Sequence, residues 1–255
     1  MTATDTAIIE VHGLSKAFGD NVLFEALELS VQRGEILCIL GGSGSGKSVL
    51  LKTLIGLVEV DRGQVLINGQ DLVPLDEEQR APLRQRVAMV FQGGALFDSL
   101  SVGNNVAYPM LRQGRIAVAE VPARVAEALE LVGLGGNEQM MPAELSGGMR
   151  KRVALARAIA AEPEVLLYDE PTTGLDPINT RRINDLMRSV QERRKLTSIL
   201  VTHDLPSAFM VSDRIAMLAD RHILVVDTPA AFRRSQLETV RDFVSAMTPE
   251  YLEAP

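Results

Sequence analysis

The residues best suited to chemistry lie in GGSGSGKSVL, from Gly41 to Leu50. The spacing of Gly41, Gly46, Lys47 and Ser48 matches G-x-x-x-x-G-K-[ST], the phosphate-binding P-loop. Glycines let successive backbone N–H groups turn toward one anion, and the following helix adds its positive N-terminal end. We expect Lys47 to reach the β- and γ-phosphates of a nucleotide and the Ser48 hydroxyl to bind Mg²⁺. A Gly/Ser linker is the alternative, but it would not normally connect an apolar strand pattern, EILCIL, to a helical one, VLLKTLIGL.

Two acids, Asp169 and Glu170, end the apolar segment VLLYDE. Phosphoryl transfer to water needs a metal ion and a group that orients the attacking water. Because the sites of open α/β sheets lie beside the carboxyl ends of strands, we expect Asp169 to help bind Mg²⁺ and Glu170 to polarise water. The alternative is a pair of solvent-facing acids that only cap the strand.

Gln92 and His203 also follow apolar segments, VAMVF and SILVT. The amide of Gln92 is able to approach both metal and water from a loop, and His203 is a candidate for contact with the γ-phosphate or the water. Taken singly, such a glutamine is more often a surface residue and such a histidine more often structural. Their candidacy therefore depends on the P-loop upstream.

The segment LSGGM, Leu145–Met149, is here called the signature segment. Glycine costs a helix about 1 kcal/mol relative to alanine. Gly147 and Gly148 at a helix start are therefore better explained by bare backbone approaching an anion, with Ser146 donating alongside. Since the P-loop already supplies one phosphate site, we infer that ATP is held between two copies, each lending its signature segment to the other's P-loop. Asp176, in TTGLDP, fits the N-cap of the next helix as well as catalysis.

A framework of alternating strands and helices must position these residues. From about Asp98 to Pro142 no strand pattern occurs, and Val121, Val125, Leu129 and Val132 share one helical face. Alternation elsewhere implies a mostly parallel sheet. The strands flanking the P-loop strand, together with a late hairpin, indicate an antiparallel piece beside it. The expected strands lie in EVHGLSKAF, LELSV, GEILCILG, GQVLING, RVAMVFQ, EVLLYDEP, TSILVTHD and DRIAMLADRHILVVDTP, the last as a hairpin around Asp220-Arg221.

Composition narrows the function classes. The 255 residues are 46% hydrophobic, which allows a substantial core, and the net charge of −7 argues against a general nucleic-acid binder. The short basic clusters 150–152, 193–195 and 233–234 are interpreted as solvated helix faces. No stretch approaches the roughly 20 apolar residues needed to span a bilayer, and the N-terminus lacks signal-peptide features. One cysteine, Cys38, excludes an internal disulfide and is expected to be a buried core thiol. These features predict a cytosolic protein.

In order, the P-loop, Gln92, the signature segment, LLYDEP, GLDP and His203 resemble the ATP-binding subunit of an ABC transporter, over roughly Ile8 to Val244. The resemblance implies an α/β P-loop NTPase core with a mostly parallel sheet and an antiparallel β subdomain. It also implies one domain over 8–244 with a helical subdomain inserted at about 98–160, and a C-terminal tail at 245–255.

The resemblance further implies an ATP hydrolase that works as an ATP-sandwich dimer. Its catalytic residues are Glu170, the switch histidine His203, Gln92 and Lys47, and its Mg²⁺ ligands are Ser48, Gln92 and Asp169. An aromatic residue upstream of the P-loop stacks on adenine in this family, and Phe18 matches that position, an ordinary core phenylalanine being the alternative. The implied nucleotide contacts are Phe18, Gly41, Gly42, Ser43, Gly44, Ser45, Gly46, Lys47, Ser48, Val49, Ser146, Gly147, Gly148 and Asp176.

The fifth residue of the signature segment is usually Gln in this family and is Met149 here. LSGGMRKR together with FQGGALFDSLSVGNNVAYP is similar to ATPases of the Mce-linked, Mla-type phospholipid transporters. That similarity implies a polytopic permease, an Mce-domain lipid-binding protein and a STAS-type regulatory protein as partners, beside the second copy that the ABC family implies. It places the chain on the cytoplasmic face of the inner membrane. The segment after Gln92 receives a permease coupling helix in such ATPases, and Leu96, Phe97 and Leu100 are candidates for that groove, unless they pack within the helical subdomain.

Two other functions stay open. An ATPase for import of amino acids or another small solute has the same chemistry but would more typically carry Gln at position 149. A soluble ABC protein of DNA repair or translation would usually carry two ATPase units or a long coiled-coil insertion. This chain has one P-loop, one signature segment and an acidic net charge, so no nucleic-acid partner is expected.

Overall fold

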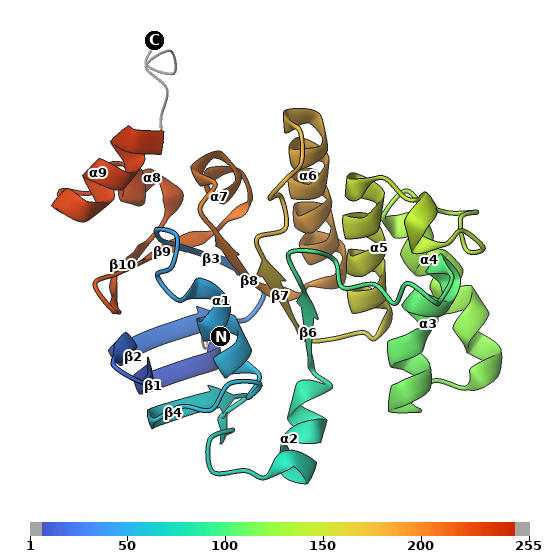
Figure 1. Cartoon of the computed structure of the whole chain (residues 1–255), viewed down its shortest axis with the longest axis horizontal. Helices are drawn as coiled ribbons and strands as arrows, with labels where there is room; N and C mark the ends of the chain where they lie inside the picture. Colours follow the sequence, from blue (N-terminus) through green and yellow to red (C-terminus); the bar gives the residue numbers. More distant parts are fainter. Residues whose placement is uncertain (1–6, 248–255) are drawn as a thin grey trace, which may run out of the picture. The chain divides into compact units, whose positions relative to one another are not determined.

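The computed structural model describes residues 7–247, which Figure 1 colours along the sequence. The chain divides into two units. The first comprises the residues up to Leu75 and from Ile199 onward, and the second is Asp76–Ser198. The later boundary falls inside strand β8 (Thr197–Thr202).

An antiparallel sheet makes up the N-terminal part of the first unit. Its strands are β1 (Ala7–Phe18), β2 (Asn21–Gln32), β4 (Arg62–Ile67) and β5 (Gln70–Asp71). They follow the order β2-β1-β4-β5. Along β2 the alternate residues Leu27, Leu29 and Val31 are buried, as their spacing predicts.

The strand that leads into the P-loop belongs to another sheet. In the first unit this sheet consists of β3 (Ile36–Leu40), β8, β9 (Arg214–Ala219) and β10 (His222–Asp227), in the order β10-β9-β3-β8. Every residue of β3 is buried, Cys38 included, as predicted. The prediction that the late hairpin belongs to the antiparallel piece is wrong. Because β9 pairs in parallel along β3 and β10 returns antiparallel to β9, the hairpin extends the sheet of the P-loop strand instead.

Within residues 7–247, four helices complete the first unit: α1 (Lys47–Leu54), α7 (Leu205–Val211), α8 (Pro229–Arg233) and α9 (Glu238–Met247). Helix α7 packs against β3, and α8 packs against β9, β10 and α9. The predicted tail, 245–255, begins inside α9, whose last three residues are 245–247, and its remainder lies outside the described residues.

The second unit contains two strands and most of the long helices. Strands β6 (Val87–Val90) and β7 (Val165–Asp169) pair in parallel. The helices are α2 (Glu77–Arg84), α3 (Val102–Gln113), η1 (Val118–Glu120), α4 (Val121–Leu131), η2 (Pro142–Glu144), α5 (Gly147–Ala160) and α6 (Pro177–Arg194).

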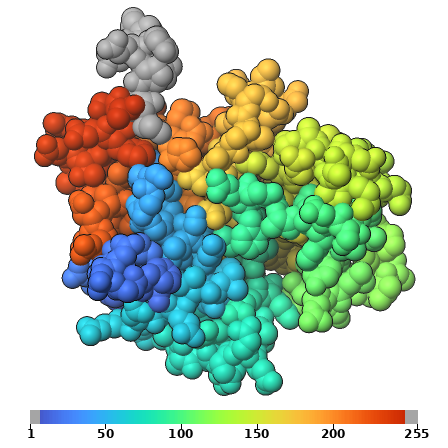
Figure 2. Space-filling model, in the orientation of Figure 1, coloured from blue at the N-terminus to red at the C-terminus, as the bar shows by residue number. Residues whose placement is uncertain are grey.

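Helices α3, α4 and α5 pack on one another, and α6 packs on α5. Figure 2 shows the surface of α3 and α4 in green and yellow-green, in the orientation of Figure 1. The predicted stripe of α4 is buried: Val121, Val125 and Leu129 are at most 6% exposed, and Val132 just beyond the helix is 3% exposed. The stretch 98–160, expected to be helical, carries these helices and no strand within the part of the chain that the structure describes.

The architecture is the predicted α/β class, with parallel strands, a separate antiparallel sheet and covering helices. The domain bounds at 8 and 244 stay a prediction. Between residues 7 and 247, no helix combines the length and apolar character that crossing a membrane requires.

Candidate functional site: a nucleotide site

The P-loop joins β3 to α1 within the first unit (Figure 1). Gly46, the N-cap of α1, has a φ of +94°, which glycine adopts without strain. A Cβ atom at Gly46 would lie 2.8 Å from the Phe24 ring, and one at Gly41 would lie 2.6 Å from the carbonyl oxygen of Leu218. Glycine is therefore the residue that fits at these two P-loop positions.

The inside of the P-loop suits an anion. Lys47 Nζ donates hydrogen bonds to the carbonyl oxygens of Gly41 (2.9 Å) and Gly42 (3.0 Å), so the ammonium lies within the curve of the loop. The buried hydroxyl of Ser45 has no hydrogen-bond partner in the described part of the chain. Helix α1 begins without a side-chain cap or an acidic residue in its first turn, so no such group offsets its positive end. These features fit a phosphate group.

Phe18 lies at the end of β1 and is 52% exposed. Its strand neighbour Lys16 pairs in the sheet with Phe24, whose ring would meet a Cβ atom at Gly46. The Lys16 Nζ lies 4.9 Å from the centroid of the Phe18 ring. An exposed ring on a strand that reaches the P-loop does not fit the alternative of an ordinary core phenylalanine.

His203 directly follows β8 and is exposed. Strand β8 is the hydrogen-bonded neighbour of β3, the strand that leads into the P-loop. The first unit thus carries the P-loop and His203 on adjacent strands of one sheet.

The second unit brings Gln92 together with the acid pair. In the parallel register of β6 and β7, Val90 is the partner of Tyr168. Gln92 lies two residues beyond Val90, and Asp169 and Glu170 lie one and two residues beyond Tyr168. Because the carboxyl ends of parallel strands meet at the same sheet edge, these three side chains lie at one edge of the second unit.

Glu170 is held in an unusual way. It is 8% exposed, and its φ of +49° lies in the left-handed region that a residue with a Cβ atom rarely adopts. Its Oε2 accepts a hydrogen bond of 3.1 Å from the Thr173 hydroxyl. The carbonyl oxygen of Thr173 in turn accepts a hydrogen bond of 2.6 Å from Lys151 Nζ on α5. The segment Glu170–Asp176, here called the acid loop, is thus tied to the helix that follows the signature segment.

Ser146 is the N-cap of α5, as predicted, and its hydroxyl accepts a hydrogen bond of 3.3 Å from the Met149 backbone N–H. A Cβ atom at Gly148 would lie 3.4 Å from the Asn179 side chain. Asp176 is the N-cap of α6 and accepts a hydrogen bond of 2.9 Å from the Asn179 backbone N–H. That bond, with a second one from the Asn179 side chain, lowers the pKa of the exposed Asp176 carboxyl. The signature segment and the end of the acid loop therefore meet at Asn179.

The predicted metal ligands fit Mg²⁺ bound together with phosphates. Among residues 7–247, no group of three or more His, Cys, Asp or Glu side chains is placed to hold a metal ion by itself. Ser48, Gln92 and Asp169 supply a hydroxyl, an amide oxygen and a carboxylate, which are the oxygen donors that Mg²⁺ prefers. One carboxylate suffices where substrate phosphates complete the coordination shell.

Comparison with known families decides the identity of the chain. The family model described as ABC transporter matches residues 24–173, from β2 through the P-loop and the signature segment into the acid loop. The chain belongs to the ABC transporter ATP-binding family. It is therefore an ABC ATPase, which binds and hydrolyses ATP as a transporter subunit.

Three relatives of this ABC ATPase carry different names. It is 39% identical over 237 residues to a probable ribonucleotide transport ATP-binding protein mkl of Mycobacterium leprae, covering 93% of this chain and 68% of that protein. It is 39% identical to the intermembrane phospholipid transport system ATP-binding protein MlaF of Haemophilus influenzae, covering 90% of this chain and 87% of MlaF. It is also 39% identical to the methionine import ATP-binding protein MetN of Brucella abortus, covering 97% of this chain and 67% of MetN.

Two solved structures share the fold. The ATP-binding cassette MJ0796, solved as a dimer in a post-hydrolysis state bound to ADP and Pi, superposes with a TM-score of 0.79 at 29% identity, covering 87% of this chain and 98% of that one. The protein cbiO1 from Clostridium perfringens, part of the ABC transporter complex cbiONQ, superposes with a TM-score of 0.81 at 27% identity, covering 96% of this chain and 100% of that one.

The prediction of a solvated face is wrong for two residues of the basic cluster at 150–152, because Lys151 and Arg152 are half-buried, whereas Arg150 is exposed as predicted. Lys151 is half-buried against the acid loop, Arg150 donates to the Leu145 carbonyl (2.7 Å), and Arg152 donates to the carbonyls of Val132 and Gly133 (both 3.2 Å). Burial lowers the pKa of the Lys151 ammonium, and the nearby Glu170 carboxylate opposes that shift. Sequence reasoning missed Lys151 and Thr173 as neighbours of the proposed base. The cluster at 193–195, by contrast, is exposed as expected.

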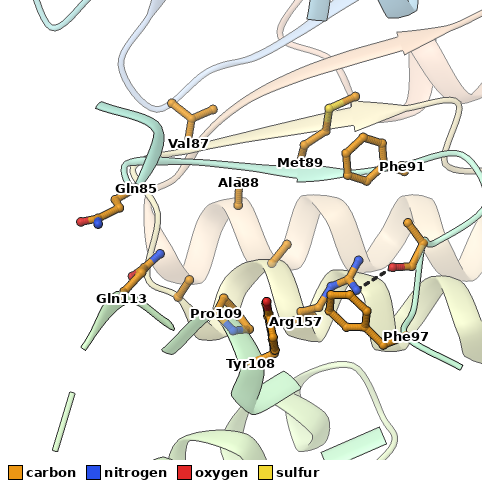
Figure 3. Close-up of a pocket in the computed structure, with 13 residues that line it drawn as sticks. Gln85, Val87, Ala88, Met89, Phe91, Phe97, Tyr108, Pro109, Gln113 and Arg157 are labelled. Atoms are coloured by element: carbon orange, nitrogen blue, oxygen red, sulfur yellow. Dashed lines mark hydrogen bonds between the residues drawn. The ribbon is translucent and has the colours of Figure 1, made fainter. Parts of the chain in front are cut away.

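The second unit also contains a groove, with a cavity volume of about 350 Å³, between β6 and helices α3 and α5 (Figure 3). Its lining includes Ala88 of β6, Tyr108 and Pro109 of α3, Arg157 of α5, and Phe97. The rings of Phe97 and Tyr108 lie 4.7 Å apart between centroids. Of the three apolar residues predicted for a partner groove, only Phe97 belongs to the lining.

Two polar side chains hold the loop beside this groove. Arg157 donates to the carbonyls of Gly94 (2.8 Å) and Ala95 (2.7 Å), and its guanidinium lies 5.9 Å from the Phe97 ring centroid. The fully buried Asn105 accepts from the Phe97 N–H (2.8 Å) and donates to the Phe97 carbonyl (3.1 Å). The loop that follows Gln92 is therefore a fixed surface of this ABC ATPase.

Proposed function

We propose that this ABC ATPase closes as an ATP-sandwich dimer and drives a membrane permease that moves phospholipid between bacterial membranes. The cargo is argued from the similarity of LSGGMRKR and FQGGALFDSLSVGNNVAYP to Mla-type ATPases, together with 39% identity to MlaF over 90% of this chain. Met149 in the signature segment supports the same cargo through the similarity described above.

In the proposed ATP site, the P-loop backbone and Lys47 bind the phosphates, and Phe18 stacks on adenine. The uncapped start of α1 and the buried Ser45 hydroxyl support this assignment. Ser146 and the glycines after it approach the γ-phosphate bound by the partner copy, and Asp176 contacts the partner copy. When bound by Ser48, Gln92 and Asp169, Mg²⁺ offsets the negative charge of the phosphates.

Hydrolysis transfers the γ-phosphoryl group from ADP to water. Glu170 accepts a hydrogen bond from the attacking water, and Gln92 and His203 help to orient it. As the new P–O bond forms, the bond to the β-phosphate oxygen breaks, so that ADP and phosphate leave. The burial of Glu170 supports this role, because a carboxylate shielded from bulk solvent interacts more strongly with one ordered water molecule.

The groove at Phe97 is the proposed docking site for a cytoplasmic coupling helix of the permease. The exposed Phe97 ring, at 42%, and the 43% exposed Tyr108 offer apolar contact area there. The chain would then lie on the cytoplasmic face of the inner membrane, with an Mce-domain lipid-binding protein and a STAS-type regulatory protein as further members of the complex.

Amino acid import is the second candidate, because MetN aligns with 97% of this chain at 39% identity. One experiment separates the two. The tagged chain is extracted gently with its complex from native membranes, and the co-purifying proteins and lipids are identified by mass spectrometry. A permease with an Mce-domain protein and bound phospholipid supports lipid transport. A permease with a solute-binding protein and no specific lipid overturns the cargo, and the absence of any membrane partner overturns the transport role.

A further inference from the structure

We propose that Lys151 is a positioning residue for ATP hydrolysis, which fixes the acid loop against the helix that follows the signature segment. The inference rests on the proposed role of Glu170 as the group that polarises water. It assigns to one side chain of α5 the task of holding that carboxylate in place within the same copy of the chain.

The main observation is a chain of two hydrogen bonds. Lys151 Nζ donates to the Thr173 carbonyl at 2.6 Å, and the Thr173 hydroxyl donates to Glu170 Oε2 at 3.1 Å. Thr173 thus contacts Lys151 through its backbone and Glu170 through its side chain. Loss of the first bond removes the contact of Thr173 with α5, and Thr173 is the residue that makes the second bond.

The strained backbone of Glu170 explains why the contact between Lys151 and the acid loop would matter. Glu170 has a φ of +49°, a conformation that persists only where surrounding contacts hold it. Two turn bonds also lie in the acid loop, from the Thr173 N–H to the Glu170 carbonyl (3.3 Å) and from the Leu175 N–H to the Thr172 carbonyl (3.1 Å). Lys151 bonds to this loop from a separate element, helix α5, so its removal should relax the loop.

The chemistry of the side chain matters as well. Lysine offers a compact ammonium with three donors on a flexible stem, whereas methionine has similar length and no donor. Arginine keeps the charge and the donors. If Lys151 only fills space, methionine should replace it without loss of activity. If its hydrogen bond positions the acid loop, arginine should preserve more activity than methionine.

Arg152 provides a matched control on the same helix. It also donates to backbone carbonyls, those of Val132 and Gly133, but these belong to the turn after α4 and not to the acid loop. Arg152→Met should therefore lower stability without changing the geometry at Glu170.

The test compares the parent, Lys151→Met, Lys151→Arg and Arg152→Met as full chains, in steady-state ATPase assays and in amide hydrogen exchange without nucleotide. For Lys151→Met we expect kcat to fall about tenfold, KM for ATP to stay within about twofold, and peptides covering 170–176 to exchange faster. Lys151→Arg should recover most of kcat, and Arg152→Met should match the parent in both readouts. If Lys151→Met does not fold, Lys151→Ala takes its place, since alanine favours the helix.

The inference fails if Lys151→Met hydrolyses ATP at the parental kcat, or if Arg152→Met loses as much activity as Lys151→Met. Glu170→Gln separates this failure from that of the proposed base. Parental turnover by Glu170→Gln would overturn the role of Glu170 itself. An inactive Glu170→Gln beside a fully active Lys151→Met would overturn the role of Lys151 alone.

Discussion

Asp61 holds the end of β1 through two contacts: its Oδ1 accepts a hydrogen bond from Lys16 Nζ at 2.9 Å, and its Oδ2 accepts one from the Ala17 backbone N–H at 2.7 Å. Phe18, the residue proposed to stack on adenine, comes next in the chain. One exposed carboxylate thus fixes the backbone just before the exposed ring.

These contacts give a pH-dependent stability. The hydrogen bond from Lys16, followed by that from Ala17, lowers the pKa of the Asp61 carboxyl below its ordinary value of 3.8. Because the folded-state pKa lies below the unfolded one, the stabilisation is present above about pH 4 and is lost as the pH falls through the folded-state pKa. Asp61→Asn should therefore lower the free energy of unfolding at pH 7, and its difference from the parent should shrink toward pH 3. Urea unfolding at both pH values checks this, with Glu59→Gln, an exposed acid nearby, as the control. An equal difference at both pH values would contradict it.

Glu170→Gln should reduce ATP hydrolysis by about 100-fold or more, since an amide cannot accept the proton of the attacking water. ATP binding should persist and the dimer should stay closed, which gel filtration with and without ATP measures. Glu164→Gln is a suitable control, because the Glu164 carboxylate forms an exposed ion pair with Arg86, of 3.4 Å, just before the opposite end of β7. Turnover at the parental rate in Glu170→Gln would rule out this residue as the base.

Ser146→Ala should reduce hydrolysis by roughly 10- to 100-fold while leaving ATP binding to an isolated copy within about twofold, because the serine is proposed to act on the partner's nucleotide. The same change removes the N-cap of α5 and should cost about 1 kcal/mol of stability. Ser101→Ala removes the equivalent cap of α3, also at 3.3 Å, and should show only the stability loss. Equal losses of ATP binding and hydrolysis in Ser146→Ala would argue against a role on the partner's nucleotide.

Phe97→Ala should weaken assembly with the permease about tenfold or more, since an exposed aromatic ring in the lining of a groove is a common hot spot of binding. ATP hydrolysis by the isolated chain should stay within about twofold. Leu111→Ala, on the same helix as Tyr108 and 52% exposed, lies outside the groove lining and should leave assembly unchanged. The measurement is the amount of permease that co-purifies with the parent and with each of the two variants. If Phe97→Ala retains as much permease as the parent, the groove is not part of the interface.

Local signals made much of this molecule predictable. The P-loop spacing, the N-cap at Ser146 and the buried stripe of α4 each depend on residues that are close in sequence, and the structure has all three. The acid pair at the end of β7 was predictable because an apolar segment that ends in charge marks the end of a buried strand.

Long-range contacts were less predictable. The late hairpin pairs through β9 with β3, a strand about 175 positions earlier. The residue pattern of a strand does not indicate which other strand it pairs with. The cluster Arg150–Arg152 predicts a solvated face, because the sequence of three cations on a helix does not show whether their side chains contact water or bond to a carbonyl. Only the path of the acid loop, 22 residues further on, places Thr173 at Lys151.

Helix α5 connects the two regions that are proposed to contact different partners. It has 14 residues and is therefore about 21 Å long. Its first turn is capped by Ser146, and Arg157, one turn from the far end, is bonded to the loop beside the groove. A helix bends little over four turns, because each backbone hydrogen bond would have to lengthen. The helix should therefore move as a rigid rod. If two copies close on ATP as proposed, a tilt imposed at its first turn would also move the groove proposed for the permease.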